Sequence, residues 1–197
     1  MRRLLAIVLV LMMAIVPTVL AEEQTTTDDV ALVTQDFGDF SMTFPEDIVG
    51  AVVERENNQP FLQMYWDYDE TKPFNMNLNC TWSETYSNVT VGDPNQTAQL
   101  VLEQVVGQFE QMQIAVANPA VLAAAVDEQD GKPALVYVFS MDLDLTGSGV
   151  DQKYTLYTMQ AVVSDEAFGT YTFTISTDDL AAAEPLMEIT NTVTWNK

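Results

Sequence analysis

Apolar and polar residues alternate with a period of two along much of this chain. In residues 37–45 (FGDFSMTFP), bulky apolar side chains alternate with serine and threonine, which predicts a half-buried strand that Pro45 ends. Residues 61–68 and 74–82 alternate in the same way, and turn-forming residues separate them. We therefore expect these two segments to pair as a hairpin.

The second half of the chain predicts a meander of longer strands. Residues 121–126 form a short apolar run, and residues 127–133 predict a turn with Asp130 and Gly131 at its tip. Residues 134–145, 152–163 and 170–176 follow as three strands separated by turns. In the last of these, aromatic and aliphatic residues face inward and threonines face outward.

Two segments have helical spacing. Asp93 followed by Pro94 is typical of a helix N-terminus, and apolar residues then recur every three or four positions up to Met112. A second helix is predicted near residues 182–193, starting close to Glu184 because Pro185 fits only in a first turn. Together these elements predict an α+β fold, with an antiparallel β-sheet flanked by helices, in a single domain over residues 30–197.

The N-terminus has the layout of a secretory signal peptide. Arg2 and Arg3 precede an apolar run, and small residues end at Ala21. We expect cleavage there, so that residues 1–21 are removed, residues 22–29 form a flexible acidic leader and no stable membrane span remains. An uncleaved membrane anchor is the alternative. The expected location is outside the cytoplasm of a bacterium, secreted or at the cell surface.

Charge and composition exclude several functions. The chain has 29 acidic and seven basic residues, a net charge of −22, and such a field repels nucleic acid. It contains no histidine, which removes the usual general base and the commonest metal ligand. Its single cysteine, Cys80, alternates with apolar residues and is interpreted as a small buried hydrophobic residue. Serine or cysteine hydrolysis is therefore disfavoured.

The order of elements resembles the PsbP-like domains, which include exported bacterial proteins of the DcrB and LpqN kinds. The resemblance rests on FSMTFPED, on DGKPALVYVF, and on the ending YTFTISTDDLAAAEPLMEITNTVTW, and it spans about residues 33–195. It implies an α/β/α sandwich that serves as an accessory or binding module, generally without catalysis. The chain lacks the acylated cysteine of the lipoprotein members and the histidines of the plant members.

Two pairs of aspartates are candidate metal ligands. Asp67 and Asp69 are two residues apart in a predicted strand, and Asp142 and Asp144 repeat the arrangement on another. If those strands were neighbours, four carboxylates would meet, and Ca²⁺ would suit such a site. The alternative is that they are solvated acids at strand ends. The same carboxylates are also weighed as the acid and base of a small glycoside hydrolase.

Aromatic and amide side chains form a candidate ligand platform. Tyr65, Trp66 and Tyr68 lie in the first strand of the predicted hairpin, and Asn75, Asn77 and Asn79 alternate along the second. Asparagine is a poor strand former, so three in alternate positions are unusual. The competing interpretation is that Trp66 and Tyr68 belong to the core and that the asparagines are a wet strand face.

The function predicted from these observations is a secreted, non-enzymatic accessory or binding domain without a cofactor. Its expected partner is an extracellular protein or a glycan. A calcium-dependent binding module and a small carboxylate-based glycoside hydrolase are the alternatives.

Overall fold

The computed structural model describes residues 31–72 and 74–196. The predicted signal peptide and leader lie outside these residues. The strands are β1 Leu32–Asp36, β2 Phe40–Pro45, β3 Val49–Val52, β4 Gln59–Tyr65, β5 Asn77–Ser83, β6 Ala115–Gln129, β7 Lys132–Asp144, β8 Lys153–Asp165, β9 Gly169–Thr177 and β10 Thr194–Trp195. The helices are α2 Pro94–Gln111 and α3 Glu184–Asn191, with 3₁₀ turns η1 Leu145–Ser148 and η2 Leu180–Ala183.

The strands form two antiparallel sheets. The larger has the order β3-β4-β5-β9-β8-β7-β6, and the smaller has the order β1-β2-β10. The β4–β5 hairpin is paired as predicted, and the meander from β6 to β9 returns so that β9 lies beside β5. This crossover makes the first hairpin and the last strand of the meander neighbours in one sheet.

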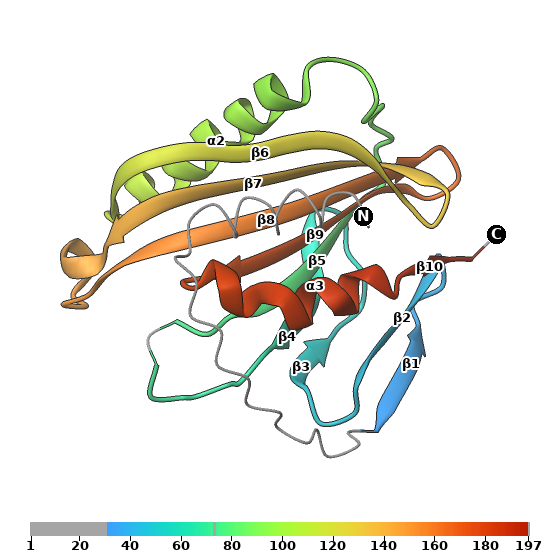
Figure 1. Cartoon of the computed structure of the whole chain (residues 1–197), viewed down its shortest axis with the longest axis horizontal. Coiled ribbons are helices and arrows are strands. Elements are labelled where there is room, and N and C mark those ends of the chain that lie inside the picture. The colour runs from blue at the N-terminus through green and yellow to red at the C-terminus, as the bar shows by residue number, and fades with distance from the viewer. Residues whose placement is uncertain (1–30, 73, 197) are drawn as a thin grey trace, which may run out of the picture.

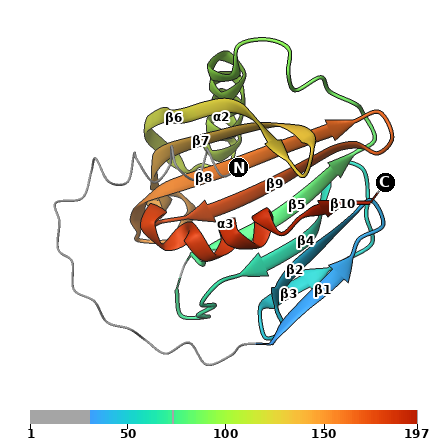
Figure 2. The same cartoon turned by 45° about the vertical axis from the view of Figure 1, so that its right-hand side comes forward.

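The two faces of the large sheet carry different cover (Figure 1). Helix α2 packs on β6 and β7 around a core that includes Leu102 and Phe139. On the opposite face, α3 and the small sheet cover a second core that includes Phe40, Leu186 and Trp195 (Figure 2). The α+β class and the antiparallel sheet are confirmed. The helices provide only part of the cover, because a small sheet that the pattern did not predict provides the rest.

Local sequence signals position several elements as predicted. The carboxylate of Asp93 caps α2 by accepting from the Asn95 backbone N–H over 2.9 Å. Helix α3 begins at Glu184, before Pro185. Asp130 and Gly131 have φ angles of 47° and 79°, so they form the two-residue turn that joins β6 to β7.

Other boundaries differ from the sequence prediction. Strand β4 ends at Tyr65, so Asp67 and Asp69 lie in a loop. Strand β6 extends far beyond the predicted apolar run, because a bulge between Ala117 and Ala120 absorbs Asn118 and Pro119. Proline is tolerated there because β6 is an edge strand and needs no partner for each N–H.

Strands β1 and β3 were not predicted. Most of their residues are exposed and so show little alternation of apolar and polar types.

Within the described residues, neither helix is long and apolar enough to cross a lipid bilayer.

Candidate functional site

An open pocket of about 290 Å³ lies where β4 ends, against the turn between β2 and β3. Its lining residues are Pro45, Asp47, Ile48, Val49, Tyr65, Trp66, Asp67 and Tyr68. Below, this site is called the aromatic pocket. It brings three aromatic side chains and two carboxylates together from segments about twenty residues apart in the sequence.

The aromatic side chains have different environments. The ring centroids of Tyr65 and Tyr68 are 5.3 Å apart, with the ring planes tilted by 60°. Trp66 packs partly against the core, and its backbone N–H donates to the Met76 carbonyl over 3.1 Å. Tyr68 is 49% exposed, so it presents its ring to solvent. Trp66 therefore forms a wall of the pocket that the core holds in place, and Tyr68 forms a wall that a ligand can contact.

The backbone at Asp67 turns the chain out of the sheet. Asp67 is exposed and has a φ of 48°, a left-handed conformation that ends strand β4. The prediction that Asp67 and Asp69 share one face of a strand is therefore wrong. Asp69 instead organises the next turn, where its carboxylate accepts from the backbone N–H and the hydroxyl of Thr71. The Thr71 hydroxyl and N–H hold the pKa of Asp69 below its usual range.

The three asparagines have separate roles. Asn75 lies just before β5 and closes the β4–β5 loop, because its side chain both accepts from the Asp69 N–H over 2.8 Å and donates to the Asp69 carbonyl over 3.0 Å. Asn77 donates to the Asn75 carbonyl over 3.0 Å. Asn79 makes only a long contact of 3.5 Å to the Asn77 side chain. The asparagines do not line the aromatic pocket, although Asn77 is the cross-strand neighbour of Tyr65.

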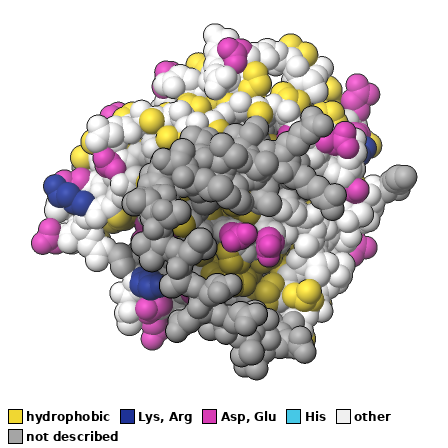
Figure 3. Space-filling model, in the orientation of Figure 1, with side chains coloured by type: hydrophobic (Ala, Val, Ile, Leu, Met, Phe, Trp, Pro, Cys, Tyr) yellow, Lys and Arg dark blue, Asp and Glu magenta, His cyan; other side chains and the backbone are white. Residues whose placement is uncertain are grey.

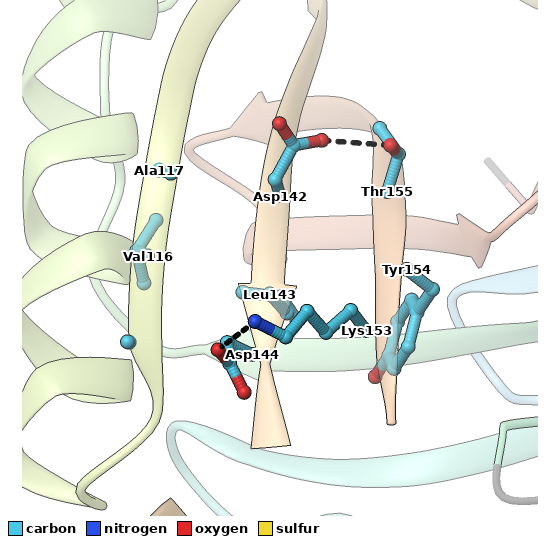
Figure 4. A pocket seen from close by; sticks show the side chains of 9 residues that line it. Val116, Ala117, Asp142, Leu143, Asp144, Lys153, Tyr154 and Thr155 are labelled. Carbon is cyan, nitrogen blue, oxygen red and sulfur yellow. Dashed lines mark hydrogen bonds and ion pairs between the residues drawn. The ribbon is translucent and has the colours of Figure 1, made fainter. Parts of the chain in front are cut away.

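Asp142 and Asp144 border a second depression of about 480 Å³ at the end of β7 (Figure 4). Asp142 accepts from the Thr155 hydroxyl and from the Asn118 amide, each over 2.7 Å. Asp144 pairs with Lys153 over 2.7 Å and also accepts from Thr146. The Asn118 and Thr155 hydrogen bonds lower the pKa of Asp142. The hydrogen bond from Lys153, and to a smaller extent those from Thr146, lower the pKa of Asp144 to about 2.

The two aspartate pairs do not converge. Three strands, β5, β9 and β8, separate β4 from β7 in the large sheet. Residues 31–72 and 74–196 contain no group of three or more acidic or cysteine side chains arranged to hold a metal ion. The four-carboxylate arrangement considered for calcium is therefore not formed.

Cys80 is fully buried on β5, and burial raises the pKa of its thiol well above the usual value. A thiol in this environment is a poor nucleophile, because the thiolate is the reactive form. The interpretation of Cys80 as a core residue agrees with its position.

The visible face of the molecule in Figure 3 carries scattered acidic side chains and few basic ones.

Four residues of the aromatic pocket were not identified from the sequence as site residues. Pro45 ends β2, and Asp47, Ile48 and Val49 belong to the turn after β2 and to β3. Val49 is the cross-strand neighbour of Tyr65, which brings this turn to the end of β4. Nothing in the sequence pattern predicted β3, so no local signal placed these residues beside the tyrosines.

Comparison with solved structures identifies the fold. The chain is similar to the cyanobacterial PsbP from Synechocystis, with a TM-score of 0.59 and 11% identity over 89% of this chain and 98% of that one. The Ran-binding protein Mog1p from Saccharomyces cerevisiae matches with a TM-score of 0.47 and 12% identity, over 85% of this chain and 95% of that one. A Pseudomonas aeruginosa protein of unknown function matches with a TM-score of 0.35 and 11% identity, over 80% and 91%.

No protein-family model and no curated protein matches the chain. The PsbP-like fold expected from the sequence is thus confirmed by structural similarity. Because identity is so low, the similarity shows the fold and transfers no functional residues.

Proposed function

We propose that this protein is an exported, non-enzymatic binding domain that contacts its partner through the aromatic pocket. The observation that carries the proposal is the meeting of Tyr65, Trp66 and Tyr68 with Asp47 and Asp67 in one open site. Exposed aromatic rings beside polar groups are characteristic of binding surfaces, because they bury a large area and still offer hydrogen bonds. The partner is an extracellular protein or a glycan.

Several features support a role without catalysis. The chain has no histidine, and its one thiol is buried. Among the carboxylates weighed for glycoside hydrolysis, hydrogen bonds hold the pKa values of Asp69, Asp142 and Asp144 below the ordinary range, whereas a glycosidase acid needs a raised one. The proposed location outside the cytoplasm rests on the signal-peptide pattern of residues 1–21. The finer α/β/α arrangement of PsbP-like domains fits the same picture, with α2 and α3 on opposite faces of the sheet.

Retention of the protein on extracellular material tests this proposal. The protein is recovered from outside the host cells, and its N-terminal residue is determined; we expect Glu22. Binding to the host's surface fraction is then compared for the wild type, Tyr65→Ala/Tyr68→Ala and Tyr86→Ala, since Tyr86 is also exposed but lies outside the pocket.

We expect the double variant to lose at least nine tenths of the retention and Tyr86→Ala to keep it. Equal retention by all three proteins would show that the aromatic pocket is not the contact site. Recovery of the protein only from the cytoplasm would contradict its export.

A further inference from the structure

One face of the large sheet carries a continuous patch of uncharged, hydrogen-bonding side chains next to the aromatic pocket. We call it the neutral patch. Its members are Gln63 and Tyr65 on β4, Asn77, Asn79 and Thr81 on β5, Thr172, Thr174 and Ser176 on β9, and Gln160 on β8.

The register of the strands aligns these residues in rows. Gln63 lies opposite Asn79, which lies opposite Thr174, which lies opposite Gln160. A second row runs from Tyr65 through Asn77 to Ser176 by the same pairings, and it ends there because the next residue, Thr158 on β8, is only 5% exposed. Residues directly opposite each other point to the same face of a sheet, so the rows form one surface. Their chain neighbours, such as Cys80, Phe173 and Ile175, face the core on the other side.

Elements at both margins border the neutral patch. Helix α2 covers β6 and β7 on this face of the sheet. The segment 84–93 that leads into α2 crosses one end, where the Ser87 N–H donates to the Ser164 hydroxyl over 2.9 Å and the Thr170 hydroxyl donates to the Thr85 carbonyl over 2.7 Å. Strands β4, β5 and β9 lie between these elements and the aromatic pocket, and Gln160 on β8 is the half-buried margin of the patch.

The patch has hydrogen-bonding capacity that the protein does not use. The side chains of Gln63, Thr174 and Ser176 make no hydrogen bond to residues 31–72 or 74–196, and none of the three is buried. Asn79 has only its long contact to Asn77. A side-chain amide offers two donor hydrogens and an acceptor oxygen, and a hydroxyl offers both kinds of bond. Asn75, by contrast, uses both its amide oxygen and its amide nitrogen to close its loop.

The patch is also electrically neutral in a chain of net charge −22. All nine of its side chains lack a charge, so a ligand seated there desolvates no ionic group. An anionic ligand would be repelled by the field of the whole protein, and a cationic one would find no carboxylate in the patch. A neutral ligand rich in hydroxyl groups matches both the charge and the mixture of donors and acceptors.

We infer that the neutral patch binds an extended neutral glycan whose end rests on the ring of Tyr65. Tyr65 belongs both to the second row and to the lining of the aromatic pocket, so it joins the two surfaces. From Gln63 to Gln160 the first row crosses four strands, a length of about 14 Å at the usual strand spacing, enough for several sugar rings. The inference rests on the proposed binding function and names its ligand class.

Titration followed by NMR tests the inference. The ¹⁵N-labelled purified protein is titrated with the neutral hexasaccharides of cellulose, chitin and starch, and with hexagalacturonate as the anionic comparison. We expect saturable shifts of the side-chain amide signals of Gln63, Asn77, Asn79 and Gln160 with at least one neutral glycan. We expect none with hexagalacturonate.

Two variants on the patch and one matched control locate the site. Asn79→Asp keeps the shape and adds a charge, and Thr174→Val removes one hydroxyl while keeping a β-branched side chain. We expect the first to weaken binding at least tenfold and the second about threefold. Gln104→Glu makes the same change of charge as Asn79→Asp on the exposed side of α2 and should leave the affinity within twofold. Melting curves establish that each variant is folded.

The inference is overturned if no neutral hexasaccharide shifts the patch at millimolar concentration, if both patch variants bind like the wild type, or if hexagalacturonate binds as well. Capture of a protein partner that leaves the patch signals unchanged would also overturn it. If the retention assay still depends on Tyr65 and Tyr68 in that case, the proposed binding function stands without the glycan. If neither the retention assay nor the titration gives the expected result, both the proposed function and the glycan inference are wrong.

Discussion

The hydroxyl of Tyr171 donates a hydrogen bond of 2.6 Å to the carboxylate of Asp39, across 132 positions of the chain. Tyr171 lies on β9 in the large sheet, and Asp39 lies in the turn between β1 and β2 of the small sheet. Arg55 pairs with the same carboxylate over 2.5 Å and lies 4.7 Å from the centre of the Trp82 ring. This contact therefore fastens the two sheets together at the edge of their shared core.

Tyr171→Phe should lower the free energy of unfolding by about 1–3 kcal/mol, because a hydrogen bond to a charged group is lost and its acceptor stays partly buried. Tyr157→Phe is the matched control, since no described residue bonds to its hydroxyl, and should cost less than about 0.5 kcal/mol. Urea denaturation measures both. Combination with Asp39→Ala in a double-mutant cycle should show coupling; additive effects would mean that the two groups do not interact in solution.

Gly169 and Gly107 should respond in opposite directions to replacement by alanine. Gly169 has a φ of 84°, and a Cβ atom there would lie 2.2 Å from the Ser83 carbonyl oxygen. We expect Gly169→Ala to cost about 2 kcal/mol or more. Gly107 lies inside α2 with nothing within 4 Å of its Cβ position, so Gly107→Ala should stabilise by about 0.5–1 kcal/mol. Thermal melts of both variants check this prediction. Melting temperatures that shift in the same direction by the same amount would contradict the expectation drawn from the backbone geometry.

Stability should fall at high pH because of Tyr137. Burial raises the pKa of this phenol to about 12, and its hydroxyl donates to the Gln160 side chain over 2.5 Å. The raised pKa means that the folded state holds the proton more tightly, so the contribution is complete below about pH 10 and is lost as the pH rises towards 12. The loss is about 2–3 kcal/mol.

The check is the difference in stability between pH 9 and pH 12 for the wild type and Tyr137→Phe. The variant should lose less free energy of unfolding over this range than the wild type. Part of the loss that remains in the variant is assigned to Tyr154, because burial and the nearby Asp178 raise the pKa of that phenol as well. An identical alkaline loss in both proteins would rule out Tyr137 as its source.

Calcium should stabilise the protein only as a general electrolyte. Within the described residues the two aspartate pairs form no common group that could hold a metal ion, and Asp142 and Asp144 are occupied by Asn118, Thr155 and Lys153. We expect CaCl₂, MgCl₂ and NaCl at equal ionic strength to raise the melting temperature by similar amounts, because each screens the repulsion of a highly acidic chain. Asp142→Asn/Asp144→Asn is the control. A rise specific to calcium that this double variant loses would instead establish a calcium site on β7.

Sequence reasoning was accurate where a local rule applied. The alternation in β9, the cap at Asp93 and the turn at Asp130 and Gly131 each depend on residues within a few positions, and the structure contains all three. It failed at Asp67, because alternation continues past Tyr65 although the backbone leaves the sheet there. It also failed for β1 and β3, since exposed strands need no apolar face.

By itself the sequence determined the class of fold, the absence of histidine chemistry and an outward face of threonine and asparagine on β5 and β9. Only the tertiary structure decided that β9 lies beside β5, which joins those side chains into one patch and separates the aspartate pairs. It likewise decided that the turn after β2 meets the end of β4 and forms the aromatic pocket. The physical reason is that periodicity reports which face of a strand is buried, whereas the order of strands depends on packing between segments far apart in the chain.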